Sequence, residues 1–473
     1  MKYPLRIKLE CLFTLCFAGW MLIAQAVDVQ PQPAQPKYIF LMIGDGMGVS
    51  QRASAEMYKR ITTSAKPGEE NGQLVMNRFP IKGLTTTHPN GSPITDSAAA
   101  ATAIACGEKT QNGRIAVSYD NQKKFRSIAY DAQEAGMKVG IVSSVPIDHA
   151  TPACFYAHQA SRGNYYEIAI QVASSKFNYF AGQSFLGANK KKMKGRPAPE
   201  NVAKKAGYTS FHGKDGLTQI HPGMDKILWL NNTPYAIDSQ EGDVTLADLT
   251  RKGIKVLENK QGFFLMVEGG KIDWTGHAND LATNIKETLA FDQAVQIAYD
   301  FYREHPRETL IIVTGDHETG GLKTAFSGGF SPPEFVRAIN GQKKSGARFA
   351  PETKTWVSRK ISQQDALERV CETFGLKNLT SEEKAELNKV IEYTLNTQPT
   401  DTRPPELKQM YGTKNMVANA CQTIIAHRCG ITWTSFGHSG AAVTTTAIGP
   451  GSDPFAGQTD NTDIAKILRN ILH

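Results

Sequence analysis

Beyond its first 26 residues the sequence has no long apolar run. A transmembrane helix needs about 20 consecutive apolar residues, and no later segment of this 473-residue chain is long and apolar enough to cross a membrane. The content of 40% apolar and 21% charged residues is typical of a globular protein. We therefore expect a soluble mature chain without a membrane segment.

A large excess of charge is also missing. The formal net charge is +8, and it falls to +6 if residues 1–26, with three basic residues and Glu10, are removed. Such a small surplus of positive charge suits anionic substrates but does not indicate nucleic-acid binding.

Cysteine is scarce too. Five of seven cysteines follow residue 26, so at least one is unpaired, and export would permit but not require a disulfide among Cys371, Cys421 and Cys429.

The start of the chain has the pattern of an exported protein. Three basic residues precede an apolar run at 12–23, which is followed by the small-residue cleavage motif AQA at 24–26. We expect a signal peptide at 1–26 and a mature chain that is periplasmic or secreted. A retained membrane anchor is the alternative, but the apolar run is shorter than a bilayer requires.

Short apolar runs between turn residues predict buried strands of a parallel sheet. Most are followed within a few residues by Asp, Glu or His, and helical patterns such as 282–305 lie between them. This alternation predicts an α/β fold with a mostly parallel central sheet, which binds ligands at the carboxyl ends of its strands. The predicted strands are 38–43, 138–144, 262–267, 309–314 and 441–448.

One region departs from the alternation. From about 322 to 430 the sequence is more polar, and a capping box at Thr380 and Glu383 predicts a helix that ends near Leu395. A second helix is predicted near 415–426. We expect this region to be a mainly helical insertion, or lid, over the ligand-binding edge of the sheet.

Carboxylates and imidazoles gather at the predicted strand ends. Singly, such an Asp is usually a turn former and such a His a hydrogen-bonded bystander. Seven of them are hard to explain in this way, and mixed Asp and His ligands suit zinc. Asp273 and His277 would share one face of a helical turn. The seven residues are Asp45, Glu268, Asp273, His277, Asp316, His317 and His438.

The stretch ITDSAAAATAIACG (94–107) predicts a short helix that begins at or beside Ser97. A helix start offers free N–H groups and a positive dipole end, which favour an anion near the hydroxyl. Ordinary capping is the simpler interpretation. A serine nucleophile needs a base or a metal, and no Gly-x-Ser-x-Gly motif surrounds Ser97, so metal activation fits better than a Ser-His-Asp arrangement.

With these residues in place, the sequence resembles the alkaline phosphatase family. ITDSAAAAT is similar to the family's nucleophile signature, and the match continues in the family's order through IGDGMG, HATPACFYAHQASR, VEGGKIDWTGHAND, VTGDHETGG and FGHSGAAVTTTAIGPGS. The resemblance implies a three-layer α/β/α sandwich with one catalytic domain at 27–473. It also implies metal-dependent hydrolysis of phosphate monoesters through a phosphoserine intermediate.

The resemblance further implies two Zn²⁺ ions and a third metal, commonly Mg²⁺. The first zinc would be held by Asp273, His277 and His438. The second would be held by Asp45, Asp316 and His317, with Ser97 joining it as the nucleophile. The third metal would lie on Asp45, Thr151 and Glu268.

Arg162, at the end of HQASR, matches the family's phosphate clamp, although taken alone it is equally a surface ion pair. His149 and Trp274 stand where the best-known bacterial members have aspartate and lysine. A histidine leaves Zn²⁺, Co²⁺ or no ion open at the third site, and Trp274 is expected to shape the entrance. The family also implies small phosphate esters as substrates, inorganic phosphate as product, and a homodimer.

Other functions were weighed against this one. A sulfatase would need a Cys-x-Pro-x-Arg-type motif, which is absent around Cys106 and Cys154, and a cofactor-independent phosphoglycerate mutase has its large insertion earlier. A phosphodiesterase is an alternative because the same metals serve diesters, although Arg162 favours monoesters. The alternative of another class is an exported phosphate- or metal-binding protein without turnover, which would not need a nucleophile beside two metal sites.

Overall fold

The computed structural model describes residues 35–66, 68–324, 331–396, 404–412 and 415–473. The predicted signal peptide at 1–26 lies outside these ranges. Within them, none of the helices combines the length and apolar content that a bilayer-spanning segment needs. All five cysteines after residue 26 are free thiols.

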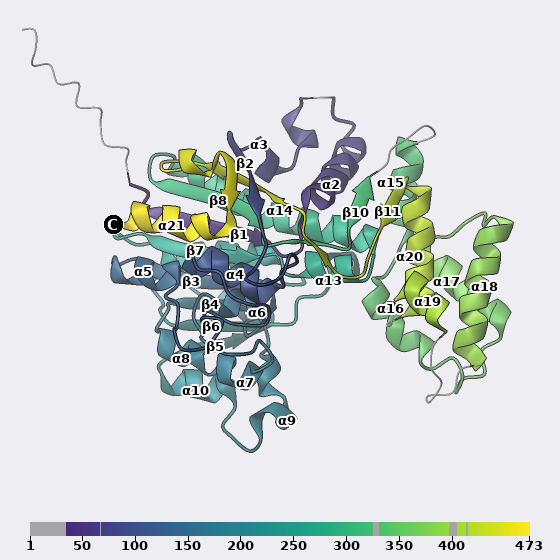
Figure 1. Cartoon of the computed structure of the whole chain (residues 1–473), viewed down its shortest axis with the longest axis horizontal. Helices are drawn as coiled ribbons and strands as arrows, with labels where there is room; N and C mark the ends of the chain where they lie inside the picture. The colour runs from purple at the N-terminus through teal and green to yellow at the C-terminus, as the bar shows by residue number, and fades with distance from the viewer. Residues whose placement is uncertain (1–34, 67, 325–330, 397–403, 413–414) are drawn as a thin grey trace, which may run out of the picture. The chain divides into compact units, whose positions relative to one another are not determined.

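A ten-stranded sheet lies at the centre of residues 35–473 (Figure 1). Seven neighbouring strands, from β8 to β5, pair in parallel. In order across the sheet, the strands are β14 (Gly457–Asp460), β2 (Ile81–Thr86), β13 (Val443–Ile448), β8 (Thr309–Gly315), β1 (Tyr38–Gly44), β7 (Phe263–Glu268), β3 (Lys138–Pro146), β4 (Tyr179–Gln183), β6 (Ile227–Asn231) and β5 (Thr209–His212).

The central strands form where the sequence is continuously apolar, because both faces of the sheet are covered. All seven residues of β1 are buried. Phe40 and Met42 pack into one hydrophobic core, whereas Ile39 and Leu41 pack into the other. The predicted strands are confirmed, with boundaries that differ by no more than two residues.

Strand β13 runs antiparallel to its neighbours β8 and β2. The beginning of β13 therefore lies at the edge where the parallel strands end. This direction explains why His438 precedes its strand in sequence while the other predicted site residues follow theirs.

Helices cover both faces of the sheet and complete a three-layer α/β/α arrangement. One core contains residues of α2 (Val49–Thr62), α3 (Val75–Arg78), α12 (Leu246–Leu257) and α14 (Leu281–Glu304). The other core contains residues of α4 (Ser97–Cys106), α5 (Ile128–Glu134), α6 (Ala150–Ala153), α7 (Tyr165–Ala169), α8 (Gln171–Ser175), α10 (Pro199–Lys205) and α21 (Asn461–Leu472).

The region predicted as an insertion is mainly helical, and its helices lie side by side, coloured green to yellow in Figure 1. Thr380 and Glu383 exchange the two hydrogen bonds of the predicted capping box at the start of α18. That this region acts as a lid stays a prediction. Its helices are α15 (Pro332–Gly341), α16 (Gly346–Thr353), α17 (Gln363–Phe374), α18 (Ser381–Asn396), α19 (Pro405–Tyr411) and α20 (Met416–Arg428).

Two short antiparallel pairs lie near the ends of the parallel strands. Strand β9 (Glu318–Thr319) pairs with β12 (His438–Ser439), and β10 (Leu322–Thr324) pairs with β11 (Ile431–Trp433). The first pair brings the DHET segment beside His438, although 121 residues separate His317 from His438 in the sequence.

Candidate active site

The register of three parallel strands brings the acidic residues to one edge of the sheet. Ile43 of β1 pairs with Glu268 of β7, and Gly44 pairs with Gly315 of β8. Asp45 and Asp316 are therefore the next residues on adjacent strands, with Glu268 beside them. Helix α13 (Lys271–His277) begins three residues after β7 and carries Asp273 and His277 to the same edge.

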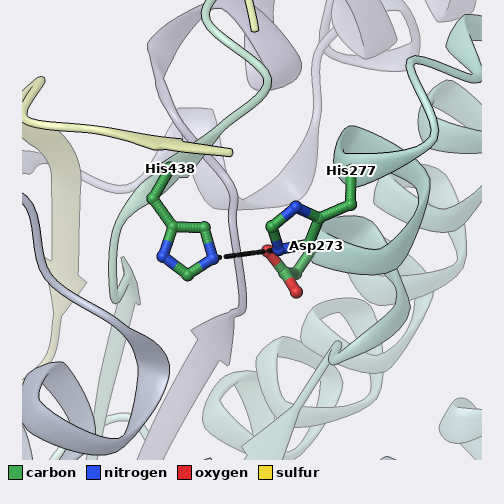
Figure 2. Close-up of side chains that lie close together, drawn as sticks. All are labelled: Asp273, His277 and His438. Carbon is green, nitrogen blue, oxygen red and sulfur yellow. Dashed lines mark hydrogen bonds and ion pairs between the residues drawn. The ribbon is translucent and has the colours of Figure 1, made fainter. Parts of the chain in front are cut away.

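Asp273, His277 and His438 form the first group of possible metal ligands. Each histidine Nε2 lies 3.4 Å from Asp273 Oδ1, and the two Nε2 atoms are 3.0 Å apart. Figure 2 shows both rings turned toward the aspartate. Asp273 is buried, whereas the His277 side chain is 40% exposed, so this group opens to the surface.

Backbone carbonyls orient the two imidazoles of the first group. His277 Nδ1 lies 2.6 Å from Phe436 O, and His438 Nδ1 lies 2.7 Å from Thr95 O. A carbonyl only accepts, so each Nδ1 carries the proton and donates it. In the neutral rings both Nε2 lone pairs then face the same point, which is the arrangement that a metal ion requires.

Asp45, Asp316 and His317 form the second group, and all three side chains are fully buried. His317 Nε2 lies 3.5 Å from Asp45 Oδ1 and 3.3 Å from Asp316 Oδ2. Ser97 Oγ is 3.2 Å from the same nitrogen. The serine hydroxyl is thus placed at the edge of this group.

The third group contains Asp45, His149 and Glu268, so Asp45 belongs to two groups. Thr151 Oγ1 donates a hydrogen bond to Asp45 Oδ2 at 3.3 Å. The structure therefore brings together the three residues expected at the third site, and it adds His149, which the sequence suggested only as an accessory residue.

Unpartnered buried atoms test whether these groups suit cations. Within the described residues, Asp45 Oδ1, Asp316 Oδ2, Glu268 Oε1 and His149 Nδ1 are buried without a hydrogen-bond partner. Buried acceptors are normally satisfied, and a cation bound between several such atoms would satisfy them together. Carboxylate oxygens and imidazole nitrogens form the donor set of zinc, so the residues fit the metals that the resemblance implies.

The pKa values of the metal-free site reflect its crowding. Burial raises the pKa of Glu268 to about 7 and that of Asp316 to about 7. Burial and the Asp316 carboxylate raise the pKa of Asp45 well above its usual value. Burial also acts to raise the pKa of Asp273, but the hydrogen bond from His438 and the nearby imidazoles outweigh it and lower that pKa.

Helix α4 begins at Ser97, as the alanine-rich sequence predicted, and its N-cap residue is Asp96. Asp96 Oδ1 accepts a hydrogen bond from the Ala99 N–H at 2.9 Å, and Asp96 Oδ2 accepts one from Arg162 Nη1 at 3.0 Å. Asp96 thus caps the helix of Ser97 and also fixes Arg162 beside it. The helix is therefore capped by Asp96 and not by Ser97, and the ion pair of Arg162 is partly buried, not a surface pair. Neither contact conflicts with a role in binding.

Trp274 lies on α13 between the ligands of the first group. Its ring centroid is 5.9 Å from that of His149 and 6.5 Å from that of Tyr235. This half-buried ring contacts the third group on one side and a cavity on the other.

Two neighbours of His317 were missed in the sequence. Thr319 Oγ1 donates to Asp273 Oδ1 at 2.6 Å and lies 3.2 Å from His317 Nδ1, so one hydroxyl joins the first and second groups. The buried Glu318 carboxylate accepts hydrogen bonds from Gln51 Nε2, the Leu322 N–H and Ser439 Oγ. Both residues follow Asp316 and His317 directly in the DHET motif, and that position was the available signal.

The sequence and the fold were compared with known proteins. The alkaline phosphatase family model matches residues 36–473. Alkaline phosphatase 3 of Bacillus subtilis is 33% identical over 439 residues, which cover 91% of this chain and 87% of that protein. The cold-active alkaline phosphatase of the psychrophile Shewanella sp. has a TM-score of 0.74 and 30% identity, covering 92% of this chain and all of that one. The alkaline phosphatase of Thermus thermophilus shares the fold at a TM-score of 0.76.

These matches extend over nearly all of the described residues and agree with the order of motifs along the sequence. The chain belongs to the alkaline phosphatase family, and it is a phosphatase.

Removal of metal is expected to destabilise the protein more at pH 8 than at pH 5. Glu268 and Asp316 have higher pKa values when folded than when unfolded, so the metal-free folded chain binds more protons between about pH 4 and 7. Its free energy of unfolding therefore falls as the pH rises through that window. Calorimetry with and without a chelator at both pH values checks this, and equal losses would contradict it. Adding Zn²⁺ and Mg²⁺ should restore the midpoint.

Glu318→Gln is expected to weaken metal binding at the first group, measured here with the Zn²⁺ that the family resemblance implies. A glutamine side chain accepts hydrogen bonds only at its oxygen, whereas the Glu318 carboxylate accepts at both oxygens. At least one buried donor near His438 therefore loses its partner, which lowers the free energy of unfolding by about 1–3 kcal/mol. Competition with a chelator measures zinc affinity, and denaturant unfolding measures stability. Glu382→Gln, at an exposed position, is the control. A loss of stability with unchanged zinc affinity would show that Glu318 supports only the local fold.

Proposed function

We propose that the protein hydrolyses phosphate monoesters and that Ser97 is the nucleophile that becomes phosphorylated. The supporting observation is the position of the Ser97 hydroxyl, 3.2 Å from His317 Nε2 and at the start of a helix. An oxygen nucleophile and a positive helix end are thereby placed beside a group of ligands that needs a cation.

Two zinc ions are proposed for the first and second groups. When bound, zinc supplies Lewis-acid stabilisation of phosphoryl and leaving-group oxygens and lowers the pKa of coordinated hydroxyl groups. The departing alcohol oxygen would lie beside the first group, which contains Asp273, His277 and His438, because Ser97 lies beside the second group. The Thr319 hydroxyl, which contacts both Asp273 and His317, would hold these two side chains in a fixed orientation.

Arg162 is proposed as the phosphate clamp. Its Nη1 is held by Asp96, while a guanidinium has five N–H donors, so the fork retains donors for two phosphoryl oxygens. Arg162 is also close enough to the site to act on it electrostatically. Burial and, next, the positive charge of Arg162 lower the pKa of His149 to about 4. A monoester has one more charged oxygen than a diester, and a clamp of this kind favours it.

The third group is proposed to hold Zn²⁺ or Co²⁺ if His149 ligates directly, and Mg²⁺ if it does not, because imidazole suits the former ions and oxygen ligands the latter. In the phosphatase of the Antarctic bacterium TAB5, which is 26% identical, the mutants His 135 Glu and His 135 Asp are described with Mg bound in the M3 site. Elemental analysis of the purified protein distinguishes these ions.

Export, dimer formation and a lid are also proposed. Export is supported by the signal-like residues 1–26, and dimer formation is supported only by the family resemblance. The lid role of residues 322–430 is supported by a cavity that some of their described residues line.

A phosphate- or metal-binding protein without turnover is less consistent with the site. Such a protein would have no need for the buried Ser97 hydroxyl, which lies 3.2 Å from His317 Nε2.

Ser97→Ala is expected to abolish formation of the phosphoserine and to lower kcat for p-nitrophenyl phosphate by about a thousandfold or more, since loss of a nucleophile costs at least that in comparable enzymes. Zinc content should be unchanged because the Asp and His ligands remain. Ser174→Ala, at an exposed serine, is the control. Undiminished turnover would exclude Ser97 as the nucleophile, and faster hydrolysis of the bis ester by the unaltered protein would favour a phosphodiesterase.

Arg162→Ala is expected to raise the inhibition constant of inorganic phosphate by about 10- to 100-fold, which corresponds to hydrogen bonds between charged groups. Arg162→Lys should recover only part of the loss, because an ammonium lacks the planar fork. Arg196→Ala is the matched control, since Arg196 pairs with Glu167 at 2.8 Å on the surface. An unchanged inhibition constant would remove Arg162 from the clamp.

A further inference from the structure

A cavity of about 550 Å³ opens beside the first group of ligands. His277 is part of its wall, so the cavity reaches the first proposed zinc site. Three aromatic side chains also line it, namely Tyr235, Trp274 and Phe436. Cavities of this size that combine apolar walls with a few polar groups are typical small-molecule sites.

The three rings come from different segments, and the ligand site itself fixes two of them. Trp274 immediately follows Asp273 on α13. Phe436 is held because its carbonyl oxygen accepts the hydrogen bond from His277 Nδ1 at 2.6 Å. The backbone of Trp274 and of Phe436 is therefore anchored beside the first group.

Tyr235 is held by a buried lysine. Lys271 Nζ donates hydrogen bonds to the carbonyl oxygens of Thr233 and Pro234, at 2.6 Å for the latter, and lies 5.3 Å from the centroid of the Tyr235 ring. The Tyr235 and Trp274 rings meet at an interplanar angle of 62°. The part of the wall formed by Tyr235 and Trp274 is thus in place before any substrate binds, which reduces the entropic cost of binding.

The remaining wall offers little charge. It includes Ser345, Gly346 and Ala347 near the start of α16. The buried Asp280 carboxylate is already used by Gly346 N at 3.0 Å, Gln342 Nε2 at 2.9 Å and Thr283 N at 3.1 Å. Among the described residues that line the cavity there is no lysine or arginine. An additional phosphate or carboxylate on a substrate would find no lysine or arginine among these described lining residues.

We propose that this cavity binds the alcohol part of the substrate and selects an uncharged alcohol that carries a planar aromatic ring. The inference rests on the proposed function, in which the first group faces the departing oxygen. A ring leaving from that position would enter between Trp274, Tyr235 and Phe436, where edge and face contacts between aromatic groups add to the burial of apolar area.

The test compares benzyl phosphate with ethyl phosphate, two esters of primary alcohols, on the zinc-loaded full-length protein. The ratio of their kcat/KM values should favour benzyl phosphate and should fall by about threefold to tenfold in Tyr235→Leu and Phe436→Leu. Trp274 is left unaltered because its ring also contacts His149. Tyr119→Leu, at a tyrosine that is 57% exposed, is the control and should keep the original ratio.

A binding measurement tests the preference of the cavity independently of hydrolysis. Calorimetry on the unaltered zinc-loaded protein should give tighter binding of benzylphosphonate than of methylphosphonate, again by about threefold to tenfold. Equal binding of the two phosphonates, or an unchanged kinetic ratio in both folded variants, would overturn the proposal. If neither ester is hydrolysed by the unaltered protein, the proposed function fails, and the phosphonate comparison still decides whether the cavity prefers aromatic groups.

Discussion

Four carboxylates buried at one edge of a sheet are the constraint on which this molecule depends. Asp45, Glu268, Asp273 and Asp316 each have at most 4% of their surface exposed. A single buried carboxylate costs several kcal/mol unless it is paired. The four carboxylates also repel one another, and the imidazoles of the four histidines in the three groups offset only part of these costs. Burial raises the pKa values of Asp45, Glu268 and Asp316, so a cation is needed to keep these three carboxylates charged near neutral pH. The stability of the fold and its catalytic function would then depend on the same ions.

Most of the fold could be predicted because its strands are unusually clear in the sequence. A central parallel strand such as β1 is buried on both faces, so it appears as an uninterrupted apolar run that ends in a polar residue. The direction of β13 could not be predicted, because apolar content carries no information about the neighbouring strand. Five strands of the sheet, β2, β4, β5, β6 and β14, were not predicted. Strands β2, β5 and β14 are partly exposed and lack a continuous apolar pattern, and β4 and β6 are buried but only five residues long.

The candidate site shows the same division. Asp45, Asp316 and His317 follow strands directly, and strand register alone brings them together. His149 was harder to place, because its approach to Asp45 and Glu268 depends on the turn between β3 and α6. The hydrogen bonds from Thr319 to Asp273 and from Ser439 to Glu318 join segments that are distant in the sequence, and no local sequence pattern specifies them.

Asp45 has a particular place in this arrangement, because its two carboxylate oxygens face different groups of ligands. One side chain would therefore set the distance between ions bound in the second and third groups, and each ion would change the electrostatic field at the other. The affinities of the two groups for their ions would then be coupled through Asp45. A replacement of Asp45 would therefore remove a possible ligand from both groups at once.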